Sequence, residues 1–155
     1  MKLYLDIETT GLSARENEIT VIGALKGKEF IQLINGINLE PYAVNELFNG
    51  VTEIVSFNGK RFDLPFIQEN FKLEVNCNHK DLMYLGHEKG FYGGLKVIEK
   101  ELGLCRSSAV SNGKEAVILW KRHCRGCEKS LNLLLEYNKE DVINLVKLEK
   151  ILEKK

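Results

Sequence analysis

The order in which strand-like and helix-like segments follow one another is the feature that most restricts how this chain can fold. Alternating and continuous short apolar runs predict five strands, at residues 2–7, 18–25, 28–34, 53–57 and 76–82. Amphipathic spacing and capping residues predict helices at residues 40–48, 65–71, 95–102, 114–123 and 130–152. Three strands in a meander, followed by alternating helices and strands, indicate an α/β domain.

A chain of 155 residues is long enough for one core, and no repeat or linker divides it. We therefore expect a single domain over residues 1–155. No apolar run approaches the roughly 18 residues of a membrane span. The amino terminus becomes acidic at Asp6, too early for a signal peptide. These features predict a cytoplasmic protein without membrane contact.

The 22 basic residues are balanced by 22 acidic residues, so the net charge offers no general attraction to nucleic acid. Any binding of that kind must use a local basic patch or bound cations. Carboxylates gathered at one site would lose their repulsion for phosphate once divalent cations neutralise them.

The long carboxy-terminal helix carries a polar group where its spacing requires core residues. Its apolar stripe also contains Asn138 and Asp141, and is marked by Leu134, Leu145, Leu148 and Leu152. A buried carboxylate without a partner costs several kcal/mol, so we expect Asp141 to contact a cation, a donor or a metal. The alternative is a surface aspartate. Tyr137 lies one turn earlier on nearly the same face.

Two other acidic sites are weaker signals when each is taken alone. Asp6 and Glu8 are two residues apart on the first strand and so point to the same side, as a pair of metal ligands would. An ordinary strand end before a Thr-Thr-Gly turn is the alternative. Asp63 lies between an Asn-Gly turn and Pro65, where it could equally cap the next helix.

Taken in order, these sites resemble a known family. The segments Asp6-Ile7-Glu8-Thr9-Thr10-Gly11-Leu12, Asn58-Gly59-Lys60-Arg61-Phe62-Asp63 and Tyr137-Asn138-Lys139-Glu140-Asp141 resemble the DEDDy branch of 3'-5' exonucleases in the ribonuclease H-like superfamily. The second and third segments look most similar to YprB-type ribonuclease H-like nucleases. The resemblance implies a mixed five-stranded sheet, flanked by helices, whose second strand is antiparallel to the rest.

The resemblance also implies a reaction, hydrolysis of terminal phosphodiesters at single-stranded DNA or RNA 3' ends with two divalent ions, Mg²⁺ or Mn²⁺. Asp6 would bridge both ions. Glu8 and Asp141 would complete the first site, and Asp63 would hold the second ion through water. Tyr137 would orient the attacking water, because a phenol positions water more readily than it takes a proton.

Contacts to the substrate follow the same resemblance. The backbone after the first motif, beginning at Thr9, would hold the terminal nucleotide, and Leu12 would pack against its base. Asn58, Lys60, Arg61 and Phe62 form a polar, basic and aromatic group suited to phosphate contact and base stacking. Core packing is an equally good explanation for Phe62.

Two further function classes fit the same residues. One is a ribonuclease H-like module that binds nucleic acid or a protein without cutting it, or that works only within a complex. The other is a structure-specific endonuclease. Separately, Cys124 and Cys127 form a Cys-x-x-Cys pair beside His123, which leaves zinc, a disulfide and free thiols all open.

Overall fold

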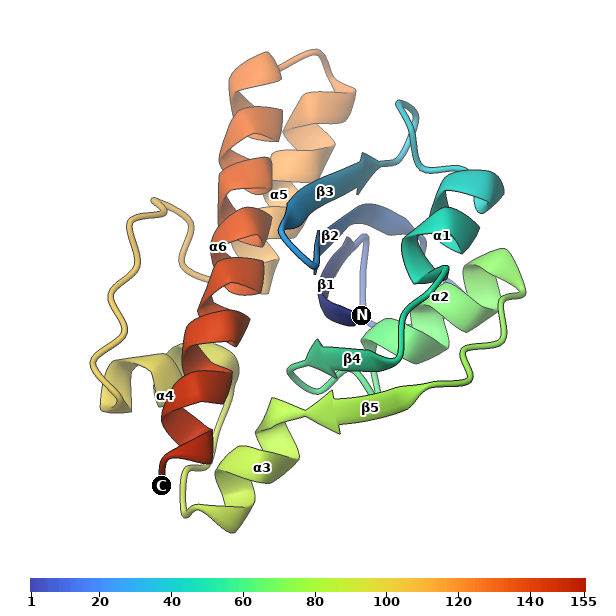
Figure 1. Ribbon diagram of the computed structural model, residues 1–155. Coiled ribbons are helices and arrows are strands. Elements are labelled where there is room, and N and C mark those ends of the chain that lie inside the picture. The colour runs from blue at the N-terminus through green and yellow to red at the C-terminus, as the bar shows by residue number, and fades with distance from the viewer.

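Five strands form one mixed sheet in the order β3-β2-β1-β4-β5, in a computed structural model that describes residues 1–155 (Figure 1). The strands are β1 (Lys2–Thr9), β2 (Ile19–Lys26), β3 (Glu29–Ile34), β4 (Glu53–Ser56) and β5 (Asn78–Asp81). β1 pairs parallel with β4, and β4 parallel with β5, whereas β2 is antiparallel to both of its neighbours. This confirms the predicted ribonuclease H-like sheet with an antiparallel second strand.

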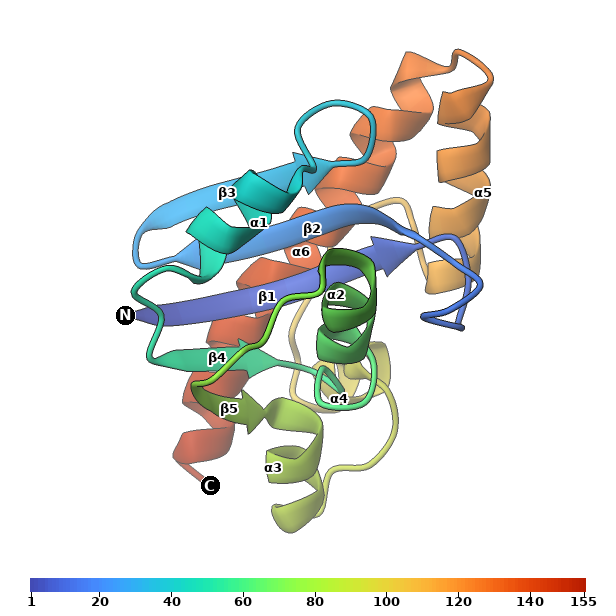
Figure 2. The same cartoon turned by 90° about the vertical axis from the view of Figure 1, so that its right-hand side faces the viewer.

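Helices cover both faces of this sheet (Figures 1 and 2). On one face lie α1 (Pro41–Phe48) and α2 (Asp63–Phe71). The long α6 crosses the other face. The helices on that side are α3 (Leu82–Glu88), α4 (Leu95–Glu101), α5 (Gly113–Cys124) and α6 (Glu128–Glu153). None of these helices combines the length and the apolar character that crossing a bilayer would require.

The central strand β1 separates apolar from acidic side chains by simple alternation. Leu3, Leu5 and Ile7 are buried in the core between the sheet and the α1–α2 layer. The residues that alternate with them from Lys2 to Glu8 therefore point to the opposite face, toward α6. Asp6 and Glu8 belong to this second set, so the strand itself directs both carboxylates to one side of the sheet.

One helix is absent from the sequence prediction. α3 begins directly after β5, so no loop residues mark the boundary between strand and helix. The helix has only seven residues, and one of them is Gly86, which is unfavourable inside a helix. Asp81 caps this helix, since its Oδ1 accepts from the Met83 amide at 3.1 Å. The same carboxylate accepts from the amides of Asn58 (2.7 Å) and Lys60 (3.1 Å) and so fixes the turn after β4.

Candidate metal centre

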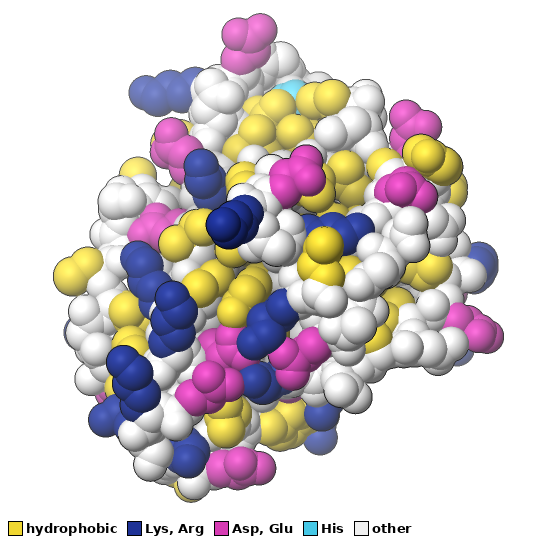
Figure 3. All heavy atoms as spheres, viewed as in Figure 1, with side chains coloured by type: hydrophobic (Ala, Val, Ile, Leu, Met, Phe, Trp, Pro, Cys, Tyr) yellow, Lys and Arg dark blue, Asp and Glu magenta, His cyan; other side chains and the backbone are white.

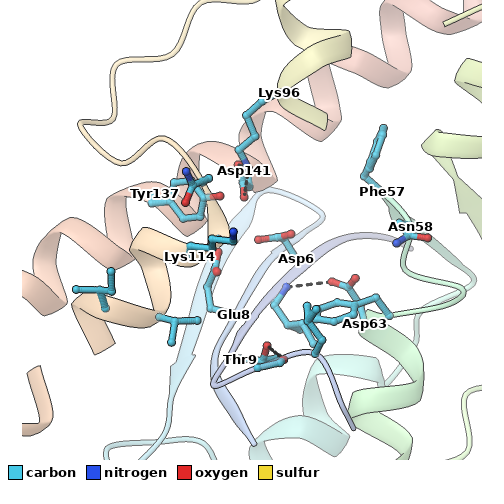
Figure 4. A pocket seen from close by; sticks show the side chains of 18 residues that line it. Asp6, Glu8, Thr9, Phe57, Asn58, Asp63, Lys96, Lys114, Tyr137 and Asp141 are labelled. Atoms are coloured by element: carbon cyan, nitrogen blue, oxygen red, sulfur yellow. Dashed lines mark hydrogen bonds and ion pairs between the residues drawn. The ribbon is translucent and has the colours of Figure 1, made fainter. Parts of the chain in front are cut away.

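Three carboxylates from two elements meet beside the carboxyl end of β1. Asp6 and Glu8 lie on β1 and Asp141 lies on α6, and each offers an oxygen within 4.8 Å of the others (Figure 4). Glu8 and Asp141 are buried, with 8% and 3% of their surface exposed. The structure therefore brings together the first and last acidic sites expected from the sequence, and Asp141 is buried on its helix stripe as predicted.

Asp6 is held in place by a polar side chain one turn before Asp141. Nδ2 of Asn138 donates to both the backbone oxygen of Asp6 (3.2 Å) and its Oδ2 (3.1 Å). The Asn138 Oδ1 accepts in turn from Nε2 of Gln32 on β3 at 3.0 Å. This chain of hydrogen bonds explains why a fully buried asparagine interrupts the apolar face of α6.

Asp63 reaches the same cavity from the opposite side. It is the first residue of α2, and its Oδ2 accepts from the backbone amide of Ile7 on β1 at 3.0 Å (Figure 4). The cap position is occupied by Phe62, and no side chain caps this helix. The carboxylate is thus tied to β1, between the two carboxylates of that strand, instead of serving as the helix cap.

Burial and crowding disfavour negative charge in this cluster. Burial, followed by the charges of Asp141, Glu8 and Asp63, raises the pKa of Asp6 well above its usual range. Burial, then the charge of Asp141, raises the pKa of Glu8 to about 8. Burial raises the pKa of Asp63 to about 7, against the effect of the Ile7 amide. A bound cation would reverse these penalties.

Two basic side chains that the sequence did not single out bind Asp141. Nζ of Lys96 lies 3.0 and 3.1 Å from its two oxygens, and Nη2 of Arg106 donates to Oδ1 at 2.6 Å. A signal for Lys96 existed, because a lysine in the first turn of a helix is disfavoured by the helix dipole and so suggests a local anion. Arg106 lies between helices and gave no such signal.

The carboxylates line a cavity of about 870 Å³ that opens between β1, the start of α2 and the start of α5. Four of the predicted substrate-binding residues also line it, namely Thr9, Leu12, Asn58 and Phe62. Phe62 both lines the cavity and packs against the core, since its ring centroid lies 4.9 Å from the ring centroid of Phe66. Lys60 and Arg61 are exposed and lie outside the lining.

α5 supplies a wall that the sequence did not assign to the site. Lys114 reaches the cavity from the first turn of this helix (Figure 4), and Val117 and Ile118 add apolar surface. Ile118 is 48% exposed and Leu12 is 88% exposed, so large apolar side chains remain accessible at this cavity. The cavity thus combines carboxylates, two lysines and apolar rims.

The surface charge agrees with the neutral composition. On the face shown in Figure 3, Lys and Arg side chains gather on one side, with Asp and Glu side chains lying among them.

The four cysteines are free thiols, and Cys124 and Cys127 are exposed. Asp6, Glu8 and Asp141 are the one group of potential metal ligands whose atoms all lie within 4.8 Å of one another, and these two cysteines do not form such a group with His123.

This fold and this buried acidic centre define a class of α/β proteins in which carboxylates gather beside the central strand of a mixed sheet. The chain belongs to the RNase H superfamily, which it matches over residues 3–153. Comparison with curated proteins gives no significant match.

Solved structures with the same fold include one described as the apo form of a nuclease, with a TM-score of 0.69 and 21% identity, covering 97% of this chain and 70% of that one. NrnC of Brucella melitensis with bound Mg²⁺ has a TM-score of 0.69 and 23% identity, covering 99% of this chain and 72% of that one. The Nibbler EXO domain of Aedes aegypti has a TM-score of 0.64 and 17% identity, covering 99% and 78%. The family B DNA polymerase of Pyrobaculum calidifontis has a TM-score of 0.76 and 15% identity, covering 97% of this chain and 24% of the polymerase.

Proposed function

We propose that the chain is a metal-dependent 3'-5' exonuclease of the DEDDy type, closest to the YprB-type nucleases, that hydrolyses terminal phosphodiesters of single-stranded DNA or RNA. The observation that carries this proposal is the convergence of Asp6, Glu8 and Asp141, whose oxygens lie within 4.8 Å of one another. Three carboxylates this close, of which Glu8 and Asp141 are buried, are costly unless a cation binds them.

The donor set fits a hard divalent cation. All three groups offer carboxylate oxygens, which Mg²⁺ and Mn²⁺ prefer over nitrogen or sulfur ligands. No basic side chain forms an ion pair with Asp6 or Glu8, so these two groups are available for a cation. We infer two ions, with Asp6, Glu8 and Asp141 holding the first and Asp63 contributing to the second.

Each chain residue then has a defined task. When bound, the ions would lower the pKa of an attacking water and stabilise charge on the departing 3' oxygen. Burial, then the charge of Asp141, raises the pKa of Tyr137 above its usual range, so its hydroxyl stays protonated at neutral pH. In the cavity, that hydroxyl can orient a water molecule by hydrogen bonding, although it is a poor base.

The kinds of side chain that line the cavity support a nucleic-acid strand with an unpaired base as the substrate. Leu12 and Phe62 offer apolar surface to a base, and Asn58 and Lys114 offer donors to a phosphate. Among the structural neighbours, NrnC has been solved with bound Mg²⁺ and bound to pGG, which supports a role for metal and short nucleic acid in this fold.

Hydrolysis of labelled oligonucleotides tests the proposal. Single-stranded DNA and RNA labelled at the 5' end should be shortened stepwise from the 3' end in Mg²⁺ or Mn²⁺, and neither should be shortened in EDTA. Asp6→Ala and Asp141→Ala should each abolish this activity, whereas Glu101→Ala, at an exposed position of α4, should retain it. Full activity of either aspartate variant would rule out the proposed site.

Circular single strands extend the test to the other function classes. A 3'-5' exonuclease leaves a circle intact because it requires an end. Cleavage of the circle would instead establish an endonuclease. Binding of linear strands without hydrolysis in either metal would establish a non-catalytic module.

A further inference from the structure

The protein itself supplies two cations to one carboxylate of the metal centre. Lys96 contacts both oxygens of Asp141, at 3.0 and 3.1 Å, and Arg106 donates to Oδ1 at 2.6 Å. Asp6 and Glu8, which belong to the same cluster, have no such ion pairs. A role for these two basic groups must therefore be specific to Asp141.

Arg106 is fixed by a second anion. Its Nη1 donates to both oxygens of Glu99, at 2.9 and 3.0 Å, and Glu99 is 1% exposed. The Arg106 side chain is 15% exposed and does not line the cavity that holds the carboxylates. Arg106 thus bridges two buried carboxylates and can stay in place whatever enters the cavity.

Lys96 is placed differently. Its side chain is 33% exposed and lines the cavity, and Asp141 is its one ion-pair partner. Its ammonium also lies 4.5 Å from the ring centroid of Tyr137. A lysine on a flexible stem can move its charge over several ångströms, unlike an arginine held in a fork by two carboxylates.

We propose that Lys96 is a catalytic residue that leaves Asp141 when a divalent cation binds there and then donates to a phosphate oxygen of the bound strand end. This step rests on the proposed exonuclease function. A divalent cation held by Asp141 would repel the ammonium and neutralise the carboxylate, and the phosphate of a bound strand would bring a new anion into the cavity that Lys96 lines. At the phosphate, the ammonium offsets the negative charge that the transition state spreads over the oxygens.

If Lys96 exchanges Asp141 for the phosphate, removal of its ammonium should change metal binding and nucleic-acid binding in opposite directions. In Lys96→Met the cation site loses a competitor, so metal should bind more tightly. The strand end loses a donor, so nucleic acid should bind more weakly. A lysine that merely supports the position of Asp141 would instead weaken metal binding when it is removed.

Calorimetric titration with Mn²⁺ tests the first effect on the full chain. Lys96→Met should bind Mn²⁺ at least about fivefold more tightly than the unsubstituted protein, in line with ordinary coupling energies between sites. Lys100→Met, at an exposed position of the same helix, should bind Mn²⁺ as the unsubstituted protein does. Equal or weaker binding by a Lys96→Met protein with a normal circular dichroism spectrum would overturn the proposal.

Binding of a fluorescent single-stranded octanucleotide in Ca²⁺ tests the second effect. Lys96→Met should reduce the slope of log Kd against log salt concentration by about one, as loss of one phosphate contact does. In Mg²⁺ its kcat should fall by about 10²-fold, with partial recovery in Lys96→Arg. An unsubstituted chain that binds and never cuts overturns the proposed function, whereas equal kcat in the unsubstituted protein and Lys96→Met overturns only the role of Lys96.

Discussion

The side chain of Asn138 on α6 fills the space above Gly23 on β2 where any other residue would place its Cβ. A Cβ built on Gly23 would overlap the amide group of Asn138. Gly23 pairs with Asp6 on one side and with Gln32 on the other, the two residues that Asn138 hydrogen-bonds. The glycine in the middle of a strand is thus explained by the close approach of α6 to β2 beside the carboxylate cluster.

Gly23→Ala should therefore be destabilising and should disturb the metal centre. The added methyl group must displace Asn138 and break its bonds to Asp6 and Gln32, at a cost of about 1–3 kcal/mol in the free energy of unfolding. Urea denaturation measures this change. In the double variant with Asn138→Ala the overlap disappears, so the two costs should be strongly non-additive. Simple additivity would contradict the contact.

Glu8→Gln should make the metal-free protein more stable and the metal-bound protein inactive. Glu8 is buried without an ion pair, and its raised pKa shows that the charge is unfavourable there. At pH 8.5 in EDTA the neutral amide should raise the melting temperature by a few degrees. Mn²⁺ should stabilise the unsubstituted protein and have little effect on Glu8→Gln. Glu101→Gln, at an exposed position, is the control and should leave the melting temperature unchanged. A lower melting temperature for Glu8→Gln in EDTA would show that the charge of Glu8 is not unfavourable in the metal-free protein.

Asp141 was predictable from the sequence because a carboxylate on an apolar helix stripe needs a partner. The same logic applies to Glu149, two turns later and 2% exposed. Its partners are Lys2, Lys80 and the Tyr4 hydroxyl, in a network remote from the cavity. Helical spacing alone therefore identifies buried charge without distinguishing a metal ligand from a structural ion pair. The ordered resemblance is what assigns Asp141, and not Glu149, to the proposed metal site.

The succession of strands along the chain was also predictable, since period-two alternation and turn residues are local signals. The mixed sheet with its antiparallel β2 followed instead from the family resemblance. The contacts of Lys96 and Arg106 with Asp141 were not predictable, because they depend on how α4 and the segment after it pack against α6. The place of Lys96 in the first turn of α4 indicates only that an anion lies nearby. The wall formed by Lys114, Val117 and Ile118 depends on the packing of α5 in the same way. The spacing of apolar residues along one element does not predict which side chains of a distant element it will contact.

The metal-free protein should lose stability as the pH rises from about 6.5 to about 8.5. The pKa values of Asp63 and Glu8 are raised to about 7 and about 8, above the value near 4 of exposed carboxyl groups. The folded state therefore binds more protons than the unfolded state in this range, so deprotonation favours unfolding. His79, whose pKa is lowered chiefly by burial, titrates below this window.

Urea denaturation in EDTA across this pH range measures the effect, and saturating Mn²⁺ should reverse the trend because the cation favours the charged carboxylates. Glu8→Gln should show a shallower pH dependence, since one of the carboxyl groups with a raised pKa is gone. A free energy of unfolding that rises with pH in EDTA would contradict the predicted direction.

Tyr137→Phe should slow catalysis without weakening metal binding. The ring lies 4.5 Å from the Lys96 ammonium and 5.4 Å from the Arg106 guanidinium, measured from its centroid, and phenylalanine preserves both contacts. Only the hydroxyl is lost, and with it the hydrogen bond proposed for the attacking water. We expect kcat to fall by about 10²-fold, with Tyr42→Phe, at an exposed position of α1, as the control. Calorimetry should give the same Mn²⁺ affinity as the unsubstituted protein; a loss of affinity equal to the loss of activity would assign the hydroxyl to the metal site instead of to the water.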